Sequence, residues 1–333
     1  MTRDLVAPWI AAQVRDLRSR RSHALLLQGP TGLGQYELAL ELARTWLCQQ
    51  AGPDGACHAC GSCHALDVRT HADLFVLMPE TVLLELGWPL GEKAQADIDE
   101  KKRKPSKEIR VDAMRDVVEF SQRTSAAGGY KVVLVFPAER MNAITANALL
   151  KTLEEPPGAV RFLLASESAH QLLPTIRSRC QSYSMAWPER EDAINWLTAQ
   201  GLSAADAATL LQASGQRPAD ALRLANAQLV GDAWSSIPMA LRRGDGRSLH
   251  ALGALERIDI LQKVCHDVQS TAVGGRPRFF APQDLPNGLR LPALSQWARD
   301  LVQARRVAEH PFNAGLMEEA LLDSAQNALN SPG

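Results

Sequence analysis

The sequence predicts an α/β domain, in which helices cover both faces of a parallel sheet, followed by an all-helical remainder. Apolar runs of strand length alternate with helical patterns as far as about residue 185. A glycine-rich loop at 29–36 separates one such run from one such helix. Beyond Trp187-Pro188, patterns rich in alanine and leucine predict helices only. Because 333 residues exceed one ordinary core, we expect three domains, over residues 1–185, 186–227 and 228–333.

The predicted strands are short runs rich in apolar residues. The expected strand at 131–136 begins with Lys131 and is apolar without interruption from there on. Such a run is typical of a central strand covered on both faces of a parallel sheet. The strands are expected at residues 22–28, 71–78, 131–136 and 161–166.

The predicted helices of the first domain place apolar residues along one face. The clearest lies at 142–154, where Ala146, Leu149 and Leu153 follow the helical repeat and Pro156-Pro157 ends the pattern. The other helices are expected at 35–48 and 111–124.

Residues 89–109 are rich in lysine, glutamate and aspartate, and they predict a mobile surface insertion. The basic run Lys101–Lys104 suggests contact with nucleic acid. Acidic residues flank this run, however, so we interpret it as a solvated, flexible loop.

The composition limits the function classes. Thirty-six lysines and arginines against 37 acidic residues give a net charge of −1, so any contact with nucleic acid is expected to be shared or indirect. No stretch approaches the roughly 20 apolar residues of a membrane span. We therefore expect a cytoplasmic protein without a membrane partner.

The loop at 29–36 resembles a phosphate-binding loop that has lost its charged residue. Gly29, Gly32 and Gly34 retain the glycines of the G-x-x-x-x-G-K-[ST] pattern. Gln35 replaces the lysine that pairs with the phosphates, and Tyr36 replaces the hydroxyl residue that holds magnesium. Only backbone dipoles remain to hold a phosphate, so we expect this chain to bind no ATP.

The acidic pair of an ATPase is missing as well. Phe136 and Pro137 occupy the end of the strand where an aspartate and a glutamate would orient magnesium and activate water. Lys131 and Lys151 are conceivable substitutes for the missing lysine, although neither lies in the loop.

Four cysteines within sixteen residues predict a metal site. Two successive C-x2-C steps place thiolates within reach of one tetrahedral ion, and four thiolates leave no open position, so a structural Zn²⁺ is expected. A set of reduced thiols or a redox pair is the alternative, and His58 or His64 can replace one cysteine. The predicted ligands, in a knuckle at 48–63, are Cys48, Cys57, Cys60 and Cys63.

Two further segments carry a family resemblance. Residues 142–157 (NAITANALLKTLEEPP) resemble the segment after the second ATPase motif of bacterial sliding-clamp loaders, which belong to the AAA+ proteins. Residues 175–180 (TIRSRC) resemble the Ser-Arg-Cys motif of the same family. A lost phosphate-loop lysine, a lost acidic pair and a retained Ser-Arg-Cys are similar to the delta-prime subunits of the DNA polymerase III clamp loader.

This resemblance implies an AAA+ core, a helical lid and a helical collar in a hetero-pentamer with gamma/tau ATPase subunits and delta. It implies action on the sliding clamp and primed DNA through the complex, within the DNA polymerase III holoenzyme and without intrinsic ATPase activity. It also implies that Arg179, next to Ser178, reaches the nucleotide of a neighbouring subunit as an arginine finger.

Alternatives remain open at this point. Arg179 can instead be a solvated arginine or part of an intramolecular ion pair, and Arg177 lies only two residues away. The chain can be an active gamma/tau-like AAA+ clamp-loader ATPase, which magnesium-dependent ATP binding would reveal. It can also be a zinc-dependent DNA-binding module, which its net charge disfavours.

Overall fold

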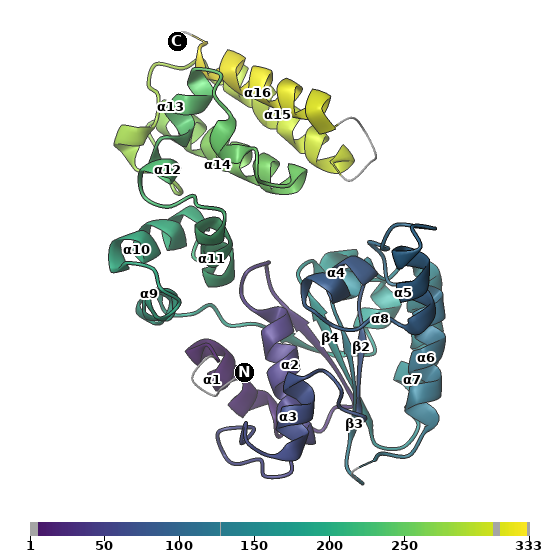
Figure 1. Cartoon of the computed structure of the whole chain (residues 1–333). Coiled ribbons are helices and arrows are strands. Elements are labelled where there is room, and N and C mark those ends of the chain that lie inside the picture. The colour runs from purple at the N-terminus through teal and green to yellow at the C-terminus, as the bar shows by residue number, and fades with distance from the viewer. Residues whose placement is uncertain (1–5, 127, 309–313, 332–333) are drawn as a thin grey trace. The chain divides into compact units, whose positions relative to one another are not determined.

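The computed structural model describes residues 6–126, 128–308 and 314–331 of the chain. The chain divides into two compact units, Met1–Asp192 and Ala193–Gly333 (Figure 1). Among the described helices, none combines the length and the apolar character needed to cross a membrane.

The first unit is built on a five-stranded parallel sheet with the strand order β2-β3-β4-β1-β5. Four strands lie where the apolar runs predict them, whereas β5 is an edge strand whose side chains are mostly exposed. The strands are β1 (Ala24–Gln28), β2 (Leu74–Leu77), β3 (Lys131–Val135), β4 (Val160–Ser166) and β5 (Gln181–Ser184).

Helices cover both faces of this sheet (Figure 1). On one face, Met114 of α6 and Leu149 of α7 share a core cluster with Val133 of β3 and Phe162 of β4. Helix α2 packs on the opposite face. The helices of this unit are α1 (Pro8–Leu17), α2 (Gln35–Leu47), α3 (Gly61–Asp67), α4 (Glu80–Glu85), α5 (Glu92–Asp99), α6 (Val111–Gln122), α7 (Ala143–Glu154) and α8 (Pro174–Arg177), with 3₁₀ turns η2 (Ala138–Arg140) and η3 (Ala169–Gln171).

The charged segment at 89–109 differs from its prediction as a mobile insertion. It contains helix α5, and Arg103 makes a two-pronged ion pair with Glu80, with Nη1–Oε2 and Nη2–Oε1 distances of 2.5 and 2.8 Å. Asp97 of α5 also contacts Arg103, at 3.6 Å. The basic run is therefore not a free loop, because one of its members contacts two acidic side chains.

The second unit consists of helices around one apolar core. Trp234 stacks on Phe280 there, with ring centroids 4.6 Å apart. The prediction that this helical part divides at residue 227 stays a prediction. Its elements, counting α9 that begins at the boundary, are α9 (Arg190–Ala199), α10 (Ala204–Ala213), α11 (Pro218–Asn226), α12 (Asp232–Ser235), α13 (Ile237–Arg242), η4 (Arg247–Leu249), α14 (Ala254–Ala272), η5 (Pro282–Asp284), α15 (Leu291–Val307) and α16 (Ala314–Leu329).

Candidate functional site

The glycine-rich loop has the strand–loop–helix setting that the sequence predicts. Strand β1 ends at Gln28, and α2 begins at Gln35. Gly32 and Gly34 have φ angles of 83° and 94°, a left-handed conformation that glycine adopts readily. A Cβ atom at Gly34 would lie 3.1 Å from Ile10, so the backbone of the loop depends on this glycine.

Gln35, at the position of the missing lysine, closes the loop from within. Its side chain is buried, and Nε2 donates hydrogen bonds to the carbonyl oxygens of Gly29 and Pro30, both at 2.7 Å. These two bonds use both N–H donors of the amide. The side chain therefore has neither a charge nor a donor left for a phosphate.

An aromatic cluster fills the position of the magnesium ligands. The Tyr36 hydroxyl accepts a hydrogen bond of 2.7 Å from Nε1 of Trp88, and the rings of Tyr36 and Phe136 lie 5.5 Å apart. The Arg69 guanidinium lies over Trp88, 5.7 Å from the ring centroid. Burial raises the pKa of Tyr36, so the phenol stays neutral and cannot act as an anionic ligand. The chain's own side chains thus contact one another at this corner of the loop.

The lysines considered as substitutes do not serve the loop. Lys131 is buried, and its Nζ donates to the carbonyl oxygens of Phe120 and, at 2.9 Å, Arg123, so it caps the end of α6. Lys151 is exposed near the end of α7. Neither side chain replaces the lost phosphate-loop lysine.

Arg179 lies just after α8 and bonds to the end of α7. Its Nε donates to Glu154 Oε1 at 2.6 Å, Nη2 pairs with the same oxygen, and Nη1 donates to the Thr175 carbonyl at 2.9 Å. The side chain of Arg179 remains 33% exposed. Arg179 therefore forms the intramolecular ion pair that was one of the alternatives for it, in the chain without partners.

The two neighbours of Arg179 in the motif differ from it. Ser178 Oγ donates to the Thr175 carbonyl at 3.1 Å and lies 3.5 Å from Arg179 Nη1. Arg177 is exposed, and its side chain makes no hydrogen bond or ion pair within the described part of the chain. Arg177 is thus a matched reference for any test of Arg179.

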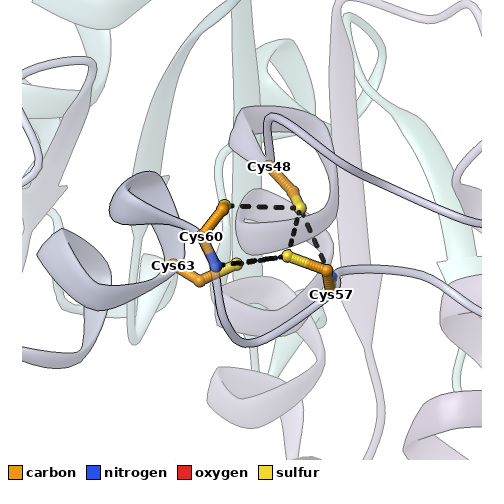
Figure 2. Close-up of side chains that lie close together, drawn as sticks. All are labelled: Cys48, Cys57, Cys60 and Cys63. Carbon is orange, nitrogen blue, oxygen red and sulfur yellow. Dashed lines mark hydrogen bonds between the residues drawn. The ribbon is translucent and has the colours of Figure 1, made fainter.

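The four predicted cysteines come together at the end of α2 and the start of α3. Figure 2 shows their side chains converging, and all four sulfurs lie within 4.8 Å of one another. Sulfur–sulfur distances of 3.5 Å (Cys48–Cys57), 3.8 Å (Cys48–Cys60) and 4.0 Å (Cys57–Cys63) match the edge of about 3.8 Å that a tetrahedron with Zn–S bonds of about 2.3 Å requires. This arrangement is compatible with a zinc site.

Backbone N–H groups support thiolates in this cluster. Cys57 N donates to Cys48 Sγ at 3.3 Å, and Cys60 N donates to Cys57 Sγ at 3.4 Å. Although burial acts to raise it, the N–H groups of Cys63 and Gln49 bring the pKa of Cys60 down to about 6. The pKa of Cys57 is lowered as well, whereas burial raises the pKa of Cys48 and of Cys63, so a metal ion would have to displace the protons of these two thiols.

The histidines considered as replacement ligands lie outside this set. His58 Nε2 contacts Glu41 Oε1 of α2 at 2.9 Å, and His64 is exposed on α3. Arg44 of α2 donates to the Cys63 carbonyl at 3.0 Å and pairs with Glu41. These contacts connect the cysteine knuckle to the helix that follows the glycine-rich loop.

Sequence reasoning missed two residues of the site. Trp88 lies 52 positions from its partner Tyr36 and belongs to no motif. Glu154 belongs to the segment that carries the family resemblance, yet its contact with Arg179 spans 25 positions. The available signal for Trp88 was its place beside the charged segment at 89–109, because a segment that is fully solvated has no use for a large aromatic side chain.

Comparisons with known proteins identify the family of this chain. The family model described as "DNA polymerase III, delta subunit" matches residues 12–188. The delta' subunit of DNA polymerase III from Pseudomonas aeruginosa is 37% identical over 264 residues, which cover 71% of this chain and 73% of that protein. The Escherichia coli delta' subunit is 34% identical, over 69% of this chain and 62% of that protein. The tau subunit from Salmonella typhimurium is 30% identical over 50% of this chain and 22% of that protein. The chain therefore belongs to the delta' subunit family of DNA polymerase III.

Proposed function

We propose that this chain is a non-catalytic subunit of a DNA polymerase III clamp loader, which supplies Arg179 in trans to ATP held by a neighbouring gamma/tau ATPase subunit. Through that arginine it helps to load the sliding clamp on primed DNA. The observation that carries the proposal is the altered phosphate loop, in which Gln35 stands in place of the lysine and bonds to loop carbonyls, and Tyr36 stands in place of the hydroxyl residue and bonds to Trp88.

The lack of ATPase activity follows from these replacements. A nucleotide in this loop meets neither the lysine charge nor the acidic pair, and the Gln35 amide already bonds to the loop. Phe136 and Pro137 offer no oxygen for magnesium and no base for water. A chain of this kind contributes to hydrolysis only by acting on nucleotide bound elsewhere.

Arg179 is the group best suited to do so. Guanidinium is permanently charged and presents planar donors that match a phosphate, and Arg179 remains partly exposed. Ser178 supports it by bonding the same Thr175 carbonyl. Arginine fingers of this type raise turnover by about 10³–10⁵ in nucleotide hydrolases.

The partners follow from the family and the domain plan. We propose that residues 1–185 form the AAA+ core, residues 186–227 a lid, and residues 228–333 a collar. In this scheme the collar joins the gamma/tau subunits and delta in a hetero-pentamer, and contact with the clamp and primed DNA is made through the complex.

The cysteine knuckle holds a structural Zn²⁺ in this proposal. Cys48, Cys57, Cys60 and Cys63 would be its ligands, and the ion would supply local order rather than chemistry, because four thiolates close its coordination shell. The knuckle would stiffen the end of α2 through Arg44.

The test is the ATPase activity of a loader reconstituted from this chain with gamma/tau and delta, stimulated by clamp and primed DNA. Arg179→Ala should lower turnover at the facing site by about 10³ or more, with assembly intact. Arg177→Ala, which removes an equal charge two residues away, should retain turnover. Unchanged turnover in Arg179→Ala would leave the chain a scaffold and refute the proposed role.

A further inference from the structure

We infer that Glu154 is the positioning residue for Arg179: it holds the guanidinium side-on and leaves the outer N–H groups for the phosphate of the neighbouring subunit. This inference rests on the proposed function and assigns a role to a second residue of the same site. Glu154 itself would contact no nucleotide.

Both ends of the contact are attached to fixed backbone. Glu154 is the last residue of α7 and follows Leu153, which lies in the core beneath the sheet. Arg179 stands between Ile176 and Cys180, which belong to the same buried cluster. The ion pair therefore joins two elements whose positions the core already sets, so it can fix the side chain of Arg179 without moving the backbone.

The hydrogen bonds of the guanidinium show which edge is held. Guanidinium has five N–H donors, one on Nε and two on each terminal nitrogen. Glu154 Oε1 accepts from Nε and Nη2, and the Thr175 carbonyl accepts from Nη1. Of the two N–H groups that remain, one on each terminal nitrogen, the only acceptor nearby within the described residues is Ser178 Oγ, at 3.5 Å from Nη1. Two terminal N–H groups are the fork that binds a phosphate in bidentate fashion.

The exposure of the pair argues that its role is conformational. Side chains 33% and 48% exposed form the kind of ion pair that contributes little to stability. A free arginine samples many rotamers, however, and must be ordered before it reaches a phosphate. If Glu154 orients Arg179 in advance, the guanidinium is in place to stabilise the charge that develops on the phosphoryl group in the transition state. The affinity of the neighbouring subunit for ATP should then stay unchanged.

The opposite outcome has a clear physical basis, which makes the inference testable. A carboxylate beside Arg179 partly cancels the positive potential that a phosphate meets. If this cancellation exceeded the gain from orientation, Glu154 would restrain the finger, and its removal would raise turnover. The sign of the change in kcat therefore decides between the two effects.

The experiment uses the reconstituted loader, with ATP as the substrate and clamp and primed DNA present. Glu154→Ala should lower kcat about tenfold, which corresponds to ~1.4 kcal/mol, with KM for ATP unchanged. Glu154→Gln keeps an acceptor oxygen and should stay within about threefold of wild type. Glu155→Ala is the matched control, because Glu155 is exposed, carries the same charge, and its side chain makes no hydrogen bond or ion pair within the described residues.

A double variant separates the inference from the function on which it rests. If Glu154 acts through Arg179, Arg179→Ala/Glu154→Ala should be no slower than Arg179→Ala alone. Wild-type or faster turnover in Glu154→Ala, with Arg179→Ala slow, overturns the inference and leaves the proposed function standing. Wild-type turnover in Arg179→Ala overturns the proposed function itself.

Discussion

The closed phosphate loop predicts that the wild-type chain binds ATP at most weakly. A nucleotide must break two hydrogen bonds from Gln35 and one between Trp88 and Tyr36. At about 1 kcal/mol each, these bonds amount to ~3 kcal/mol, or roughly a 100-fold loss of affinity. The loss of the lysine charge weakens binding further. We therefore expect a dissociation constant of about 1 mM or weaker.

The assay is equilibrium binding of a labelled ATP to the isolated chain, with and without Mg²⁺. Gln35→Lys/Tyr36→Thr should strengthen binding at least about tenfold, because it removes all three bonds and restores the charge. This variant should still not hydrolyse ATP, since Phe136 and Pro137 remain. Micromolar, magnesium-dependent binding by the wild-type chain would refute the reasoning, and accompanying hydrolysis would favour an active ATPase.

Three further predictions concern the stability of the two units and the metal site. Arg103→Ala should lower the free energy of unfolding at neutral pH, through its lost hydrogen bonds to the nearly buried Glu80 carboxylate. Because those bonds hold the pKa of Glu80 below its ordinary 4.5, the loss should be full above pH 4.5 and vanish as the pH falls through the folded-state pKa; a difference independent of pH in chemical unfolding would contradict this. A chelator should release about one zinc per chain and make four thiols reactive, whereas Cys180, whose pKa burial raises to about 12, should react only after unfolding; zinc content unchanged in Cys63→Ser would argue against the cluster. Asp267→Ala should destabilise the second unit by about 3–5 kcal/mol in denaturant titrations, since the fully buried carboxylate accepts three backbone N–H bonds of 2.7–2.8 Å that would lose their acceptor; a loss below about 1 kcal/mol would mean that water replaces it.

The sequence predicts the elements whose environment is uniform. Strand β3 is buried at every position, so its apolar run is visible without knowledge of its neighbours. Strand β5 is an edge strand with exposed polar side chains, and no local pattern distinguishes it from a loop. Helix α5 buries none of its residues, so its charged composition indicates solvation and conceals its regular structure.

The candidate site divides in the same way. Residues that share a short motif, such as the four cysteines, were predicted together because metal geometry restricts their spacing. Trp88 and Glu154 escaped prediction because their contacts with Tyr36 and Arg179 are long-range and depend on how α4, α7 and α8 pack. The sequence could not predict which acidic residue contacts Arg179. Glu154 and Glu155 are adjacent, and only the backbone at the end of α7 decides which of the two side chains points toward Arg179.

The altered loop and the held arginine have a common consequence for the proposed function. In an ATPase subunit, the bound nucleotide contacts both the phosphate loop and the neighbouring strands, and these contacts are lost when the nucleotide leaves. Here the chain's own side chains make comparable contacts. The Gln35 side chain donates hydrogen bonds to loop carbonyls, and Tyr36 packs on Phe136 at the end of β3.

The core then sets the backbone on either side of Arg179, Glu154 orients its side chain, and neither depends on a ligand of this chain. Opening the loop with Gln35→Lys/Tyr36→Thr should therefore leave Arg179-dependent turnover of the loader intact. Leu153→Ala, which leaves a cavity in the core at the residue before Glu154, should reduce that turnover although it touches neither charge. If the two variants behaved in the reverse order, the finger would be controlled from the phosphate loop, and the view of this chain as a fixed support for Arg179 would fail.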